Sequence, residues 1–193
     1  MSIYKEIISK SYDFVKENLA NSDVYFEGHI KPVARMCRNY AEKFEENEFI
    51  CELGGLFHDI GYIDDYNPRE EDHIIKGQEI TRNFLGETGL EDYFINRITN
   101  CIKTHDGNLG KNPRMENIIV NDCDAISYFD QIPTMLRLMG KWGVGFKEGI
   151  NKLRDHGIET YSNVSNHPFF RELADERYEV FSKNLDYMED LLG

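Results

Sequence analysis

Apolar residues recur at steps of three and four along most of the chain, and the strict alternation of apolar and polar residues that marks strands is nearly absent. In the segment from about 28 to 46, for example, Val33, Cys37 and Ala41 follow one another at intervals of four. This spacing places them on one face of a helix. The pattern therefore predicts an all-α protein, with helices at about 2–19, 28–46, 48–61, 71–85, 90–105, 115–131 and 168–192.

The length of 193 residues fits one domain, and no repeat, low-complexity tract or linker divides the chain. We expect a single helical bundle over 1–193, with a motif-bearing core at about 20–135 and a C-terminal helical elaboration at about 136–193. Four glycines gather in "MGKWGVGFKEG" (139–149), but they lack the spacing of a phosphate-binding loop. We interpret this stretch as a loop that joins helices.

The charge balance limits the partners of the protein. A formal net charge of -13 argues against binding to a nucleic-acid polymer, because contacts to phosphate backbones need clustered Lys and Arg. No stretch approaches 18 apolar residues and no secretion signal is recognisable, so we expect no membrane contact and a cytoplasmic location. Small anionic substrates remain compatible, because a bound metal reverses the local field. The sequence leaves the oligomeric state open.

The four cysteines are widely spaced and form no C-x-x-C pair. This arrangement suggests neither a zinc ribbon nor a thioredoxin-like redox site. We expect small buried thiols in a reducing compartment. They are Cys37, Cys51, Cys101 and Cys123.

Several polar residues lie on the apolar faces of the predicted helices. His73 and His105 each lie one turn from a small or apolar residue of a buried face, and Asp124 lies one turn after Val120. A single buried histidine is more often hydrogen-bonded than bound to metal, but one shared cation would satisfy several such groups together. Imidazole and carboxylate without thiolate favour Fe, Mn, Zn, Co or Ni. The inward-facing set is His29, His58, Asp59, His73, His105 and Asp124.

Two glycines precede His58 by one turn. Glycine inside a helix costs about 0.5–1 kcal/mol relative to alanine, so Gly54 and Gly55 together indicate a close approach by a neighbouring helix or a metal. The other two histidines are left outside the site. His156 is interpreted as a cation at a helix C-terminus before a glycine cap, and His167 precedes the helix that begins at Pro168.

The order H…HD…H…H…D resembles the HD-domain superfamily of all-α metal-dependent phosphohydrolases. "LGGLFHDIG" resembles the family's apolar-small-HD-I-G signature, and "NDCDAISYF" resembles its final D-A-D motif, which places the ligand at Asp124. The resemblance covers about 20–135 and implies two divalent transition metals (Fe, Mn, Co, Ni or Zn). It implies that His29, His58, Asp59 and Asp124 hold one ion, that His73 and His105 bring in a second, that Asp59 bridges both, and that Asp59, His73 and His105 are catalytic.

The chain departs from some relatives. Tyr62 stands where many related phosphodiesterases have a lysine after H-D-I-G. "HIIKG", which begins at His73, resembles a segment of the HD-GYP cyclic-dinucleotide phosphodiesterases. However, their later double histidine is reduced here to His105-Asp106 and their namesake motif is missing, so that assignment fails.

Five residues are candidates for binding the substrate. Lys31 and Arg35 flank the position where relatives often have an arginine, and Lys111 and Arg114 lie in the loop after His105. Solvated surface charge is the alternative interpretation, since loops are normally charged and exposed. The fifth candidate is Tyr62, and Asp65 and Asp106 are candidate proton acceptors.

The first hypothesis is metal-assisted hydrolysis of a small phosphate-containing substrate, such as a nucleotide or another phosphate ester. The alternative is a mixed-valence di-iron oxygenase that cleaves a C–C or C–P bond, because some HD-domain relatives use the same six ligands for that chemistry. A third hypothesis is a domain that only binds a ligand. The interval of 19 residues from His105 to Asp124 resembles that of compact nucleotide-hydrolysing relatives and favours hydrolysis.

Overall fold

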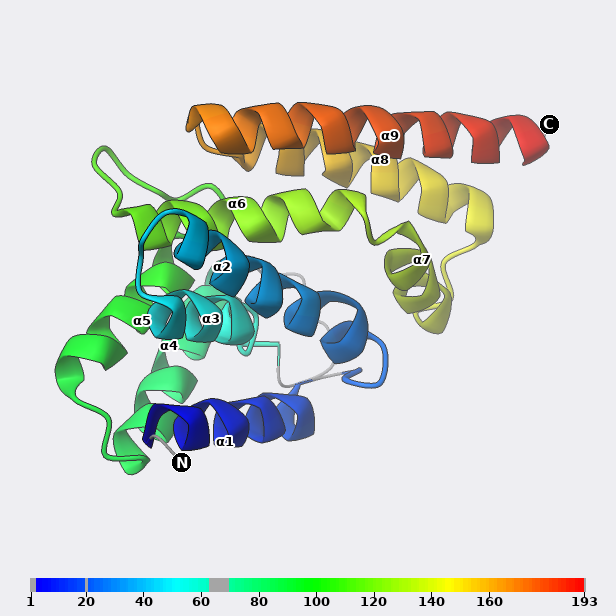
Figure 1. Cartoon of the computed structure of the whole chain (residues 1–193). Coiled ribbons are helices and arrows are strands. Elements are labelled where there is room, and N and C mark those ends of the chain that lie inside the picture. The colour runs from blue at the N-terminus through cyan, green and yellow to red at the C-terminus, as the bar shows by residue number, and fades with distance from the viewer. Residues whose placement is uncertain (1–2, 20, 63–69, 193) are drawn as a thin grey trace.

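The structure of the protein, a computed structural model, describes residues 3–19, 21–62 and 70–192, without the side chains of 70–72. These residues form nine α-helices and one π-helical segment, and no strand occurs among them. The all-α prediction is therefore confirmed for this part of the chain (Figure 1). The elements are α1 (Ile3–Asn18), η1 (Phe26–Ile30), α2 (Lys31–Lys43), α3 (Glu48–Phe57), α4 (Glu70–Glu87), α5 (Asp92–Thr104), α6 (Met115–Phe129), α7 (Ile132–Lys141), α8 (Phe146–Asn163) and α9 (Pro168–Leu192).

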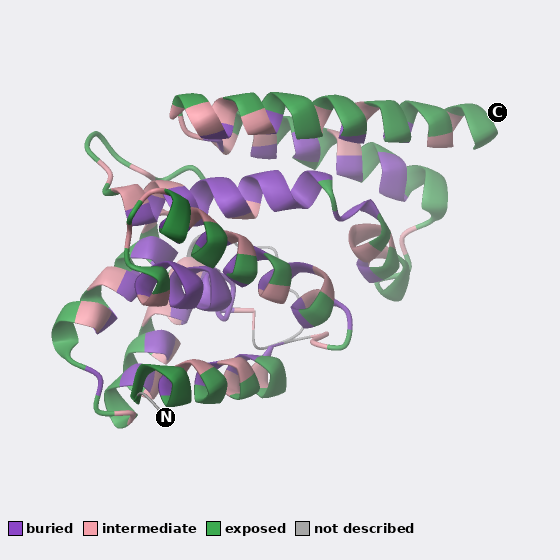
Figure 2. Cartoon of the chain, in the orientation of Figure 1, coloured by how far each residue is buried: buried purple, intermediate pink, exposed green. Residues whose placement is uncertain are grey.

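Two helices, α3 and α6, are buried along almost their whole lengths (Figure 2). The side chain of Asn47 caps α3 by accepting a hydrogen bond of 3.1 Å from the backbone N–H of Ile50. Every residue of α3 from Ile50 to Phe57 is buried, because α2, α5 and α6 all pack against this helix. α3 and α6 are therefore the centre of the bundle, and the HD pair at the end of α3 is carried by its best-packed part.

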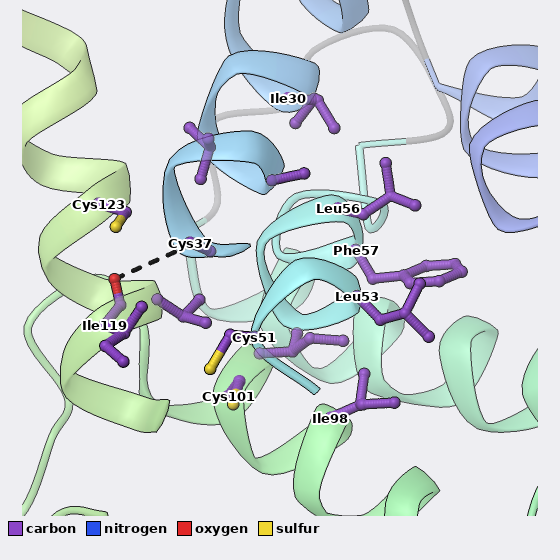
Figure 3. Packing of buried hydrophobic residues seen from close by; sticks show 14 of the residues in the cluster. Ile30, Cys37, Cys51, Leu53, Leu56, Phe57, Ile98, Cys101, Ile119 and Cys123 are labelled. Atoms are coloured by element: carbon purple, nitrogen blue, oxygen red, sulfur yellow. Dashed lines mark hydrogen bonds between the residues drawn. The ribbon is translucent and has the colours of Figure 1, made fainter. Parts of the chain in front are cut away.

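The glycine pair of α3 leaves no room for side chains beside the neighbouring helices. A Cβ atom on Gly54 would lie 2.9 Å from the Cβ of Cys101 in α5, and one on Gly55 would lie 2.7 Å from the Sγ of Cys37 in α2. Helix packing rather than a metal therefore accounts for both glycines. Figure 3 shows the surrounding core, in which the cysteines are buried and free, as predicted.

The structure corrects several predicted boundaries. The predicted helix 48–61 ends at Phe57, and the backbone continues in turns, with hydrogen bonds from the N–H of Ile60 to Phe57 O and from that of Tyr62 to Asp59 O. The predicted helix 28–46 begins instead with the π-helical segment η1 and ends at Lys43. The interpreted loop 139–149 is shorter, since residues 142–145 alone separate α7 from α8.

The C-terminal elaboration consists of α7, α8 and α9, of which the sequence pattern predicts only α9. In Figure 1, α8 and α9 run alongside α6, with α9 outermost. The interpretation of His156 as a helix-terminal residue is wrong, because α8 continues through Gly157 to Asn163. Gly157 is needed there for packing, since a Cβ atom would lie 2.5 Å from Cε1 of Phe181 in α9.

The elaboration is attached to the core by buried groups. Asp122 of α6 accepts hydrogen bonds from the backbone N–H and the hydroxyl of Ser165, which lies between α8 and α9. Phe170 and Ala174 of α9 belong to the same buried cluster as the residues of α1 to α6. This shared cluster favours the single-domain organisation, which stays a prediction. None of the described helices is long and apolar enough to cross a membrane.

Candidate metal centre

Six polar side chains from different parts of the chain meet beside the C-terminal end of α3. Five of them are buried, and the sixth, Asp124, is 19% exposed at its side chain. His29 lies in a π-helical segment, a feature that is frequent at functional sites. The six residues are His29 of η1, His58 and Asp59 of the turn after α3, His73 of α4, His105 directly after α5 and Asp124 of α6.

One half of this centre is built around His29 and His58. Their Nε2 atoms lie 3.1 Å apart, and they lie 3.2 and 3.3 Å, respectively, from Oδ1 of Asp124. Oδ2 of Asp59 lies 3.3 Å from Nε2 of His58 and 3.7 Å from that of His29. Ligand atoms around one ion with bonds of about 2.0–2.2 Å lie about 3.0–3.5 Å apart, so this half has the dimensions of a metal site.

The other half is built around His73 and His105. Their Nε2 atoms lie 3.3 Å apart, and they lie 3.6 and 3.4 Å, respectively, from Oδ1 of Asp59. The two carboxylate oxygens of Asp59 therefore face two different histidine pairs. Two groups of residues able to hold an ion result, His29–His58–Asp59 and Asp59–His73–His105, and they share only the aspartate.

The opposite ring nitrogens of three histidines hold the rings in place. Nδ1 of His58 donates to the carbonyl oxygen of Gly55 (2.8 Å), and Nδ1 of His105 donates to that of Ile102 (2.6 Å). Nδ1 of His29 donates to Oε1 of Gln131 at 2.7 Å. A neutral imidazole that donates through Nδ1 presents an Nε2 lone pair, so these rings direct acceptors toward the carboxylates. A shared cation satisfies such converging acceptors, and the donor set fits one or two divalent transition metals.

The pKa shifts within the cluster are also consistent with a site for cations. Burial alone lowers the pKa of His58, but the carboxylates of Asp59 and Asp124 raise it well above its usual value. Burial alone raises the pKa of Asp59, but the charge of His58 and the hydrogen bonds that the neighbouring histidines make to Asp59 lower this pKa well below the usual range. The site therefore stabilises positive charge among its ligands, as a cation-binding centre requires.

Two tyrosines flank the centre. The hydroxyl of Tyr25 donates a hydrogen bond to Oδ2 of Asp59, and its ring stacks on His29 with centroids 4.9 Å apart. The ring of Tyr62 stacks on His73 at 4.5 Å and 12°. Residue spacing does not indicate Tyr25 or Gln131, since neither belongs to a periodic polar pattern. Only the folded chain brings them to the histidines.

The arrangement of ligands matches what a search of protein families finds. The family model of the HD domain matches residues 26–128, more than half of the chain, and this range includes all six residues of the centre. The chain belongs to the HD domain family. Comparison with curated protein sequences gives no match.

Solved structures share the fold of this HD-domain protein over nearly its whole length. Bacillus subtilis YpgQ has a TM-score of 0.72 at 20% identity, over 97% of this chain and 96% of that chain. An HD-superfamily hydrolase from Bacillus thuringiensis has a TM-score of 0.69 at 18% identity, over 98% of this chain and 99% of that chain. YpgQ in complex with ADP gives 0.66 at 20% identity, over 95% of this chain and 96% of that chain. The structural similarity to these proteins therefore includes the region of α7 to α9.

The candidate metal centre opens into a cavity of about 1160 Å³. His29, Asp59, His73, His105 and Asp124 line one side. The C-terminal helices supply much of the rest. The apolar lining residues from α7 and the loop after it are Met135, Leu138, Met139, Trp142 and Val144, and the polar ones from α8 are Lys152, His156, Glu159, Thr160 and Asn163.

Of the five substrate-binding candidates, the structure places only Tyr62 at the cavity. Lys31 and Arg35 lie on the outer side of α2, because Val33, Ala34 and Cys37 occupy its buried face, and Lys31 pairs with Glu27 at 2.8 Å. These two residues are not among the described residues of the cavity wall.

Lys111 and Arg114 are exposed in the loop before α6 and are also absent from the described cavity wall. The guanidinium group of Arg114 instead lies 3.8 Å from the carboxylate of Glu116. Their nearness to His105 in sequence does not turn them toward the cavity. Asp106 lines the wall, and Asp65 lies outside the described residues.

Proposed function

We propose that this HD-domain protein is a binuclear metal-dependent phosphohydrolase whose substrate is a nucleotide or a related phosphate ester. The observation that carries the proposal is the position of Asp59, whose two carboxylate oxygens face separate histidine pairs. A carboxylate held in this way is suited to bridge two cations. His29, His58 and Asp124 would provide the other protein ligands of one ion, and His73 and His105 those of the second ion.

The surrounding residues hold this constellation in place. Bound divalent cations would supply Lewis acidity and a water of lowered pKa for attack on phosphorus. Three histidine rings are held by hydrogen bonds from their Nδ1 atoms to oxygen atoms of Gly55, Ile102 and Gln131. The hydroxyl of Tyr25 orients the carboxylate of Asp59. Partners of this kind typically change metal affinity or activity by about 10–100-fold when removed.

A nucleotide substrate is supported by the shape and chemistry of the cavity. Small-molecule pockets usually measure about 300–1,000 Å³ and are mostly apolar with a few polar groups. Here the apolar wall from α7 and the following loop lies with the charged centre in one cavity of about 1160 Å³. A nucleotide has the same division into an apolar base and a charged phosphate. ADP, bound by YpgQ of the same fold, is a ligand of this class.

The test is phosphate release from a panel of nucleoside mono-, di- and triphosphates under strict anaerobiosis, with protein loaded with Mn²⁺, Fe²⁺, Co²⁺ or Ni²⁺. Turnover without O₂ is expected, and it should be lost in Asp59→Ala. Turnover that requires O₂, together with a mixed-valence EPR signal, would instead identify the oxygenase alternative. No turnover of any nucleotide in either atmosphere would contradict the proposed nucleotide hydrolysis.

A further inference from the structure

The side of the cavity formed by α8 has a chemistry that the metal centre does not explain. Lys152 and His156 lie one turn apart on α8 and both line the cavity. Residues i and i+4 share one face of a helix. Leu153 is buried on another face of the same helix. α8 therefore presents a polar strip that includes Lys152 to the cavity, while its apolar strip packs inward.

The charge of the cavity makes Lys152 unusual. Among the described residues that line the cavity, it is the only lysine or arginine, and four carboxylates accompany it there. They are Asp59, Asp106, Asp124 and Glu159. Metals at the centre would offset Asp59 and Asp124, but they would hold only the phosphate group that reacts. A further phosphate of the same substrate is bound most strongly by another cation, and Lys152 is the lysine that the described wall offers.

The helix that carries the strip packs against its neighbours, and His156 lies 3.5 Å from Glu159, whereas the ammonium group of Lys152 is able to change partners. The ring of His156 meets the buried Tyr128 edge to face, with centroids 4.8 Å apart, and Gly157 fits tightly against Phe181. Lys152 pairs with Glu148 at 3.5 Å, with side chains 52% and 63% exposed. Ion pairs this exposed contribute little, so a doubly charged phosphate would compete well for the lysine.

We propose that Lys152, assisted by His156, binds the phosphate groups of a nucleoside di- or triphosphate that do not lie at the metal centre. The inference rests on the nucleotide substrate of the proposed function and assigns substrate recognition to the C-terminal elaboration. The substrate then spans the cavity from the metal ligands of the core to α8. Lys152 discriminates by the number of phosphates and takes no part in the chemical step.

The experiment compares ADP and AMP as ligands of the metal-loaded protein by isothermal titration calorimetry. Lys152→Ala should weaken the binding of ADP by about tenfold or more and leave that of AMP nearly unchanged, because a charge-assisted hydrogen bond to a second phosphate is lost. Lys152→Arg should restore most of the affinity, and His156→Ala should weaken ADP binding less. Lys147→Ala is the matched control, since Lys147 is exposed on the same helix and does not line the cavity.

Two further results would overturn the inference: ADP that does not bind the wild-type protein, or ADP affinity equal in Lys152→Ala and Lys147→Ala. An equal loss for AMP and ADP would also overturn it, because that indicates a structural effect. Steady-state turnover separates this inference from the proposed function. If Lys152→Ala hydrolyses nucleotides with unchanged KM, the role of the lysine is refuted and the hydrolytic function stands. If the variant selectively loses ADP binding but the wild-type protein hydrolyses nothing, the hydrolytic function is refuted and the role of the lysine stands.

Discussion

Asp59 connects the two halves of the candidate metal centre, since each of its oxygens faces one histidine pair. We therefore expect about two transition-metal ions per chain in the wild-type protein, about one in His73→Ala and almost none in Asp59→Ala. Inductively coupled plasma mass spectrometry on protein of known concentration measures this ratio. Circular dichroism would establish that each variant is folded.

Asp155→Ala is the matched control for these variants, because this aspartate is exposed on α8 and does not line the cavity. It should retain both ions. A ratio near one in the wild-type protein would refute the binuclear centre. Two ions retained in Asp59→Ala would show that the aspartate is not the bridge.

Gly55 is a residue of α3 that has no room for a side chain beside α2. A methyl group there would lie 2.7 Å from Cys37 Sγ and 3.1 Å from the backbone Cα of Ala34, so Gly55→Ala forces the helices apart. We expect the free energy of unfolding to fall by about 1–3 kcal/mol. Urea denaturation measures the change.

Gly86→Ala is the opposite case, because Gly86 lies in α4 with no atom near its would-be Cβ. Alanine should there raise the free energy of unfolding by about 0.5–1 kcal/mol. If both substitutions shifted the urea midpoint in the same direction, close packing at Gly55 would not be the reason for its glycine.

Among the helices, α6 carries Asp124 of the candidate metal centre and also holds the C-terminal helices. Ser165 donates to the buried carboxylate of Asp122 through both its backbone N–H and its hydroxyl. Ser165→Ala removes one of these donors, and we expect a loss of about 1–3 kcal/mol in the free energy of unfolding. Ser162→Ala, whose hydroxyl bonds only its own helix at Glu159 O, should change stability by less than about 0.5 kcal/mol.

The comparison of these two serine variants by urea denaturation also tests the attachment between core and elaboration. Hydrogen exchange at α8 and α9 should be faster in Ser165→Ala than in Ser162→Ala. Equal exchange and equal stability would mean that other contacts, such as the apolar packing of Phe170 and Ala174, hold the elaboration in place.

At the scale of the whole molecule, the six residues of the centre come from elements spread over residues 26–129. A metal that binds the folded chain and not the unfolded one stabilises it by about 2.7 kcal/mol at one hundred times its dissociation constant. For a chain of this size that corresponds to an increase of about 5–10 °C in Tm. Differential scanning calorimetry of EDTA-treated protein, before and after addition of Mn²⁺, gives the shift.

The same scans on Asp59→Ala provide the control, and they should show little dependence on Mn²⁺. A shift of equal size in that variant would place the stabilising metal elsewhere in the molecule. No shift in the wild-type protein would contradict tight metal binding at the centre.

The sequence predicts the helical class because one amphipathic period dominates it, and it indicates the six residues of the centre because buried polar groups interrupt that period. The sequence predicts helices less well where glycines interrupt the pattern. α7 and α8 escape prediction, since glycines within them resemble loop residues until tight packing, as at Gly157 against Phe181, explains them. The π-helical turn around His29 depends on hydrogen bonds that no residue pattern specifies.

Helical periodicity and residue chemistry are local properties, so the amino-acid sequence predicts the fold class and the six candidate residues of the centre. Only the folded chain shows which oxygen of Asp59 faces which histidines, that Tyr25 and Gln131 support them, and that Lys152 lines the cavity while Lys111 does not. Side-chain direction depends on how helices far apart in sequence pack together, so residue order alone does not specify it. Charge near a motif predicts proximity along the chain, whereas a binding site depends on proximity in space.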